Sequence, residues 1–329
     1  MRRSSHLYSL AALGAGSLCG ASAALCQRPA FSTQPLASTI QQPHLPTTVL
    51  VHGLDSSKET WSGVLSDLAA RGYPTLALDL RGHGESPLGP PDDFSAEALA
   101  SDVWAAVAAH GVQGPVVLVG HSMGGRIAMR VAAMHAEQPQ SPTLAAVVIE
   151  DMDLRPRFGA DPPDAKLAPA QRDALKGFEQ TDGRSFGSWE SARTALLPWF
   201  NGQAERVDSW RGKRVRETVG DGRWWSDINP AAQRLARDRV LATSDGSDAW
   251  DTLSSSASLR FPVHVWVADQ PGTVCAWDGA GGIDDMAKRL PAARVRMFDG
   301  SAHSIHNTAR EPFVQALEEV IVAAAHAMR

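Results

Sequence analysis

Residues 116–133, VVLVGHSMGGRIAMRVAA, carry the strongest structural signal in this sequence. The apolar run 116–120 predicts a buried strand, and the pattern from Met123 onward predicts a helix. The turn between them, Gly120-His121-Ser122-Met123-Gly124, fits the motif G-x-S-x-G. Such a turn is too tight for side chains on either side of the serine, and it presents the serine hydroxyl above the sheet. We therefore expect Ser122 to be a nucleophile.

On both sides of this stretch, short apolar segments alternate with helical patterns. The expected strands are 47–51, 75–80, 116–120, 145–150, 263–268 and 294–299, and the expected helices are 60–71, 95–109, 123–135, 284–290 and 312–327. The helix 95–109 is opened by Ser95. Strands that alternate with helices predict a mostly parallel sheet covered by helices on both faces. The fold class is therefore α/β, with one domain over residues 47–329.

Residues 152–258 interrupt this alternation. They are rich in Pro, Gly, Arg, Asp and Trp, with helical pieces but no clear strand. We interpret them as a helical lid, inserted after the fourth strand, over the edge of the sheet where such folds bind ligands. The tryptophans of this insertion either line an apolar pocket or form the core of the lid. They are Trp189, Trp199, Trp210, Trp224, Trp225 and Trp250.

His52-Gly53-Leu54 directly follows the strand 47–51. In sheets with a G-x-S-x-G turn, the loop at this place supplies one backbone N–H group of the oxyanion hole. The residue after the nucleophile supplies the other. The sequence therefore predicts oxyanion donors at Leu54 and Met123, with His52 holding the loop through hydrogen bonds.

Gly300-Ser301-Ala302-His303 lies between the last strand and the last helix. The chain order that accompanies G-x-S-x-G is serine, acid, histidine, and His303 occupies the loop that this order requires. We expect His303 to be the general base and His306 to be its neighbour.

The acid of the triad has two candidates, Asp151 after the fourth strand and Asp269 after the strand 263–268. Glu150 and Asp153 are weaker ones. The acid must be buried beside the histidine, and both strand ends can deliver a carboxylate there. The usual position beyond the later strand holds Pro271-Gly272-Thr273, which has no carboxylate. Asp151 is favoured, and Asp269 remains the alternative.

These residues resemble the α/β-hydrolase superfamily from about Thr47 to the C-terminus. Residues 79–86, DLRGHGES, look like its D-x-R-G-H-G-x-S loop, which is largely structural. Within this superfamily, the sequence is similar to a subgroup of short-chain acyl esterases with bacterial and mitochondrial members. The segments that carry this similarity are HGLDSS, GHSMGGR and VIEDMD. The resemblance implies that Asp151 is the acid, and it agrees with an organellar protein.

The predicted reaction is hydrolysis of a small-molecule carboxylic ester or thioester through an acyl-enzyme on Ser122. One alternative keeps the fold but acts as a C–C hydrolase or lyase on a carboxylated substrate, with Arg211, Arg214 and Arg216 as an anion clamp. A second alternative is a non-catalytic protein that retains only the pocket.

The composition excludes several other classes. The formal net charge of −5 gives no reason to expect a nucleic-acid partner. Cys19, Cys26 and Cys275 are the only cysteines, and two of them fall in the N-terminal segment, so we expect no internal disulfide. No group of His, Cys or Asp has metal-ligand spacing, so neither a metal nor a cofactor is predicted. The sequence does not indicate the oligomeric state.

Residues 1–46 are basic and Ser-rich, and the first acidic residue of the chain is Asp55. This composition is typical of a transit peptide, followed here by a Pro-containing linker. We expect an organellar protein, with the mitochondrion favoured and a plastid or secretory route as the alternative. The apolar run 7–25 contains too much Gly, Ser and Cys to predict a stable membrane span in the mature chain.

Overall fold

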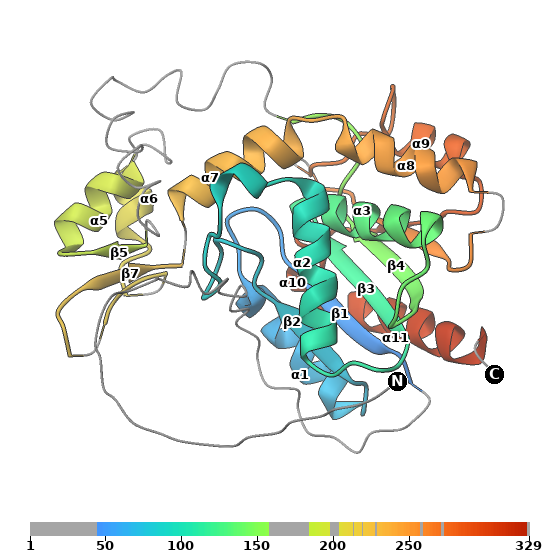
Figure 1. Cartoon of the computed structure of the whole chain (residues 1–329), viewed down its shortest axis with the longest axis horizontal. Coiled ribbons are helices and arrows are strands. Elements are labelled where there is room, and N and C mark those ends of the chain that lie inside the picture. The colour runs from blue at the N-terminus through green and yellow to red at the C-terminus, as the bar shows by residue number, and fades with distance from the viewer. Residues whose placement is uncertain are drawn as a thin grey trace, which may run out of the picture.

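The computed structural model describes residues 45–157, 184–197, 204–212, 214–218, 220–227, 229–256, 259–270 and 273–327. Its centre is a sheet of six parallel strands in the order β2-β1-β3-β4-β8-β9 (Figure 1). The strands are β1 (Thr47–Val51), β2 (Thr75–Leu78), β3 (Val116–His121), β4 (Leu144–Glu150), β8 (Val263–Ala268) and β9 (Arg294–Phe298). All six lie where the apolar runs of the sequence predict them, within two residues at each end.

Side chains alternate between the two faces of the sheet, and each face has its own core. In β1, Val49 and Val51 point into one core and Leu50 points into the other. The first core includes residues of α2 (Ala96–Ala109), α3 (Met123–Glu137), α8 (Asp245–Ser255) and α9 (Ile283–Arg289). The second includes residues of α1 (Ser62–Ala70), α10 (Ile305–Thr308) and α11 (Arg310–Ala327). Helices α8 and α11 accordingly lie on opposite sides of the sheet in Figure 1, which confirms a parallel sheet covered on both faces.

Local sequence explains where several helices begin. The Ser95 side chain accepts a hydrogen bond from the N–H of Ala98 (3.1 Å), which caps α2 as the sequence predicts. Asn229 caps α7 (Pro230–Ala236) in the same way, through the N–H groups of Ala231 and Ala232. Short helical turns lie at Lys58–Trp61, Pro91–Asp93 and Arg237–Leu241.

The insertion after β4 is not wholly helical, so that part of the prediction is wrong. It contains helices α5 (Trp189–Leu196) and α6 (Ala204–Asp208), but also an antiparallel sheet in the order β5-β7-β6. These strands are β5 (Ser185–Phe186), β6 (Val215–Glu217) and β7 (Trp224–Ser226). Strands of two or three residues are too short to show the period-two alternation by which a strand is recognised. We call the described residues from 184 to 226 the small lobe.

The small lobe has a hydrophobic core of its own. Buried Trp189 packs there with Leu196 and Val215, and its ring centroid lies 5.4 Å from that of Trp224. Trp250 instead lies in the main core, where its Nε1–H donates to the carbonyl of Met286 (3.1 Å). These tryptophans therefore serve packing, as the second interpretation proposes. Trp199 lies outside the described residues.

The predicted presequence, 1–46, lies outside the described residues except for its last two positions. Among the helices of the described ranges, none combines the length and the hydropathy needed to cross a membrane.

Candidate active site

Ser122 forms the turn between β3 and α3 with a strained backbone, φ 52° and ψ −118°. Few L residues adopt this region, so the surrounding packing must hold it. A Cβ atom on Gly120 would collide with the carbonyl of Gly124, and one on Gly124 would collide with the carbonyls of Val51 and His52. The two glycines of G-x-S-x-G are therefore required by close backbone contacts, and the turn has the geometry that the sequence predicts.

The loop after β1 packs directly against Ser122. A Cβ atom on Gly53 would lie 3.0 Å from the Cβ of Ser122, so the backbone of this loop touches the candidate nucleophile. Met123 begins α3, and the first N–H groups of a helix have no partner within the helix. The structure thus places Leu54 and Met123, the predicted oxyanion donors, in segments that flank the serine.

His52 holds this loop, as predicted. Its Nδ1–H donates to the carbonyl of Gly53 (2.8 Å), and its Nε2 accepts from the N–H of Leu80 (3.1 Å). The ring is fully buried, and burial lowers its pKa to about 4. His52 is therefore a neutral, structural imidazole.

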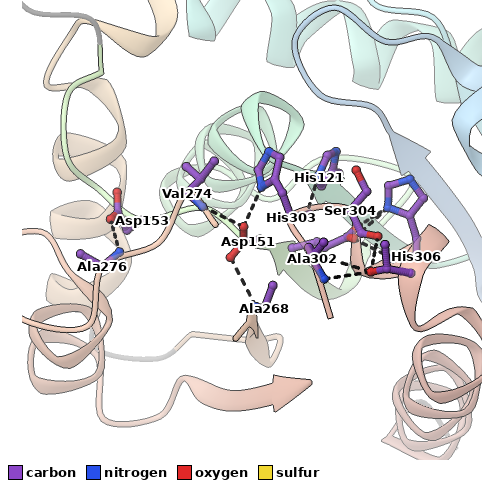
Figure 2. A network of polar contacts seen from close by, with 12 residues as sticks. His121, Asp151, Asp153, Ala268, Val274, Ala276, Ala302, His303, Ser304 and His306 are labelled. Carbon is purple, nitrogen blue, oxygen red and sulfur yellow. Dashed lines mark hydrogen bonds and ion pairs between the residues drawn. The ribbon is translucent and has the colours of Figure 1, made fainter. Parts of the chain in front are cut away.

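His303 and Asp151 meet although 152 positions separate them in the chain. The Nδ1–H of His303 donates to Oδ2 of Asp151 at 2.6 Å (Figure 2). The His303 ring also lies beside that of His121, with centroids 4.6 Å apart, and the Nε2–H of His121 donates to the carbonyl of His303 (3.0 Å). His121 immediately precedes Ser122, and the N–H of Ser122 donates to the carbonyl of Glu150 (2.9 Å). The serine, the histidine and Asp151 are therefore parts of one contact network.

The end of β8 and the segment after it surround the Asp151 carboxylate with donors. The N–H groups of Val274 (3.1 Å) and Ala268 (3.4 Å) donate to its two oxygens, as Figure 2 shows, and the thiol of Cys275 donates as well. Burial raises the pKa of Asp151, but the hydrogen bonds from His303 and Val274 outweigh burial and hold the pKa below its usual value. Sequence reasoning missed these donors, because two of them are backbone groups and nothing local links Cys275 to Asp151.

Among the described residues, no hydrogen bond joins the other candidate acids to His303. Asp269 is exposed, and Pro271-Gly272 beside it lies outside the described residues. Asp153 is buried and accepts hydrogen bonds from Arg155 (2.8 Å) and Arg157 (2.6 Å). The N–H of Ala276 also donates to Asp153 (3.0 Å, Figure 2), so donors of three residues occupy its carboxylate.

Glu150 belongs to a second buried cluster beneath the turn. The Nδ1–H of His306 donates to its Oε1 (2.8 Å), and Nε2 of His306 accepts from the hydroxyl of Thr60 (2.8 Å). His121, Glu150 and His306 offer ligand atoms within 4.8 Å of one another, a set of donor types able to hold a metal ion. The hydrogen bonds of His306 already use its two nitrogens and a Glu150 oxygen, so these contacts compete with a metal. His306 therefore has a structural role in this cluster, as the neighbour of His303 that the sequence predicts.

The D-x-R-G-H-G-x-S loop is structural, as the resemblance implies. Buried Asp79 accepts from the N–H (2.7 Å) and the ammonium (2.8 Å) of Lys58, and from the N–H of Glu85 (3.1 Å). Gly84 adopts φ 52° and packs directly on this carboxylate, where a Cβ would not fit.

The three arginines of the hypothetical anion clamp do not converge. Arg211 stacks on the rings of Trp189 and Trp224 within the small lobe, and exposed Arg216 pairs with Asp227 (2.9 Å). Arg214 alone of the three contacts the loop after β1.

Comparisons with known proteins agree with this geometry. The model of a family described as "Alpha/beta hydrolase family" matches residues 48–316. N-formylmaleamate deformylase of Pseudomonas putida is 32% identical over 266 residues, which cover 78% of this chain and 81% of that protein. Protein phosphatase methylesterase 1 of Mus musculus is 43% identical over 91 residues, 27% of this chain and 24% of that protein. A solved structure entitled "Marine microorganism esterase" has a TM-score of 0.58 at 18% identity, covering 89% of this chain and 99% of its own.

Proposed function

Because this chain belongs to the alpha/beta hydrolase family and is a hydrolase of that fold, we propose that it cleaves small carboxylic esters or thioesters through an acyl-enzyme on Ser122. The observation that carries this proposal is the 2.6 Å hydrogen bond between His303 and Asp151 beside the strained Ser122 turn. That arrangement supports a serine, histidine and acid triad.

In this mechanism Asp151 accepts the Nδ1–H of His303, which leaves Nε2 as the basic atom. His303 removes the proton from the Ser122 hydroxyl as its oxygen attacks the carbonyl carbon. The N–H groups of Leu54 and Met123 bind the oxyanion of the tetrahedral intermediate. His303 then gives the proton to the leaving alcohol or thiol. Water, activated by the same histidine, hydrolyses the acyl-enzyme and releases the acid.

The test is covalent labelling of wild-type protein and Ser122→Ala with a fluorophosphonate probe, together with turnover of short p-nitrophenyl esters. We expect labelling of the wild type alone, and a loss of kcat in the variant of at least about 10⁴-fold. Labelling of the folded variant would contradict the assignment of Ser122. An unlabelled, folded wild type would favour the alternative of a non-catalytic pocket protein.

A second candidate reaction is favoured by the Pseudomonas putida relative, which is named as a deformylase. The same triad chemistry would act there on a formyl group bound to nitrogen. The C–C hydrolase or lyase alternative also remains. A C–C hydrolase or lyase turns over simple p-nitrophenyl esters poorly, so the ester assay separates it from the proposed esterase. Release of formate from an N-formyl amide tests the deformylase reaction.

For localisation we propose an organelle, the mitochondrion first and a plastid or secretory route second, on the composition of residues 1–46. A fluorescent protein that carries residues 1–46 at its N-terminus should accumulate in mitochondria. The same fluorescent protein without residues 1–46 should not. Diffuse fluorescence in both cases would overturn the proposal.

A further inference from the structure

Arg214 extends from the small lobe toward the loop that follows β1. Its N–H donates to the carbonyl of Trp210 (3.0 Å), and its carbonyl accepts from the N–H of Asp227 (2.8 Å). The guanidinium carbon lies 4.9 Å from the centroid of the Trp210 ring, and Nη2 donates to the carbonyl of Asp55 (2.5 Å). Backbone bonds, ring stacking and a hydrogen bond to a second segment therefore orient this side chain.

The positive charge of Arg214 is half-buried, and none of the described carboxylates contacts it. Burial lowers its pKa, and the carboxylates of Asp227 and Asp55 offset this only in part. Across the described ranges, no carboxylate forms an ion pair with it within 4.0 Å. Arg216, two positions on, has such a partner in Asp227. A partly desolvated cation that lacks a contacting anion favours the binding of one from solution.

This charge lies close to the candidate oxyanion hole. Asp55 directly follows Leu54, and the charge of Arg214 is one cause of the lowered pKa of His52. The N–H of Leu54 and the carbonyl of Asp55 are at most about 7 Å apart, since two residues of chain span no more. A substrate whose carbonyl oxygen binds the N–H of Leu54 therefore lies one short acyl chain away from the Asp55 carbonyl that Arg214 contacts.

We infer that Arg214 binds a carboxylate of the substrate, so that the enzyme prefers acyl compounds with a carboxylate a few carbons from the scissile carbonyl. The planar guanidinium fork matches both carboxylate oxygens. The inference deepens the proposed function and rests on it for the reaction at Ser122, but the binding step does not require turnover. Arg211 and Arg216 take no part, because Arg211 stacks on tryptophans of the small lobe and Arg216 is paired with Asp227.

The experiment compares monoethyl succinate, which carries the carboxylate, with ethyl pentanoate, which is neutral, by the ethanol that each releases. Wild-type protein should have the higher kcat/KM on the half-ester. Arg214→Gln should lower the ratio of the two kcat/KM values by about 30-fold or more, chiefly through KM. Arg214→Lys, which keeps the charge but not the fork, should lower the ratio less. Arg216→Gln is the matched control and should leave it within about twofold.

Two results would overturn the inference. One is a wild-type enzyme that hydrolyses the neutral ester at least as well as the half-ester. The other is an equal loss on both esters in the Arg214 variants, which would mean that Arg214 only positions the loop. If wild type hydrolyses neither ester, the proposed esterase function fails instead. In that case, calorimetric titration with monoethyl succinate decides the inference. Ser122→Ala should bind this half-ester, and the double variant Ser122→Ala, Arg214→Gln should not.

Discussion

Asp151 is the residue on which the electrostatics of the candidate triad depend. It adopts φ 44°, a conformation that Asp tolerates better than bulky or β-branched residues do. Its side chain is fully buried and accepts from His303, Val274 and Ala268, so its negative charge is well solvated by protein donors. A carboxylate held in this way orients the imidazole and stabilises the imidazolium that forms during acyl transfer.

Replacing Asp151 by Asn should therefore lower kcat roughly 10⁴-fold, because the amide favours the wrong tautomer of His303. Asp269→Asn is the matched control, since Asp269 is exposed at the neighbouring strand end, and it should change kcat by less than about threefold. Steady-state kinetics on one short ester measures both. A large loss in Asp269→Asn with little change in Asp151→Asn would reverse the assignment of the acid.

At the scale of elements, the site depends on how closely α3 approaches β1. Gly124, in the first turn of α3, lies against the carbonyls of Val51 and His52, which belong to the end of β1 and the loop after it. Gly120, at the end of β3, lies against the backbone of Gly124. A larger residue at either position would push the helix away from the strand and relax the conformation of Ser122.

Gly124→Ala should accordingly destabilise the protein by about 3 kcal/mol, the upper part of the usual range for an overpacked core. Gly114→Ala is the control, because a Cβ there meets nothing within 4 Å, and it should change the stability by less than about 0.5 kcal/mol. Urea unfolding followed by tryptophan fluorescence measures both. Equal midpoints for Gly124→Ala and wild type would show that the close contact is not required.

At the scale of the whole molecule, several imidazoles are buried in the neutral form. Burial lowers the pKa of each, because it disfavours the charged ring. They are His52 (about 4), His83 (about 3), His121 (about 4) and His264 (about 4). In the unfolded chain the same rings have pKa values of about 6.5.

The protein should therefore lose stability as the pH falls from about 6.5 toward 4. In this window the unfolded chain binds protons that the native state does not, so protonation favours unfolding, by up to about 3 kcal/mol for each ring. Burial raises the pKa values of Asp55 and Asp227, and these two groups therefore offset part of the loss of stability. The pKa of Asp151 is lowered, so Asp151 adds to the loss only at pH values below the usual carboxyl range. Urea midpoints at pH 7.5, 6 and 5 provide the measurement. Identical midpoints at pH 7.5 and 5 would contradict this account.

Local sequence patterns were sufficient for the order of strands and helices, the Ser95 cap and the Ser122 turn. Each of these depends on residues within one or two elements, where apolar periodicity, capping side chains and glycine positions are visible in the chain. The position of His303 also followed, because the order of the motif along the chain specifies the loop that carries the histidine. The short strands of the small lobe did not follow, since two or three residues show no period.

The sequence favours Asp151 but keeps Asp269 as an alternative, and only the tertiary structure shows which carboxylate contacts His303. Both follow a strand, and the sequence shows no difference in how their carboxylates are directed. The donors that surround Asp151, the pairing of Glu150 with His306 and the approach of Arg214 to Asp55 join segments that lie more than 100 positions apart. Such contacts depend on how strand ends and loops come together in space, and no periodicity along the chain encodes that arrangement.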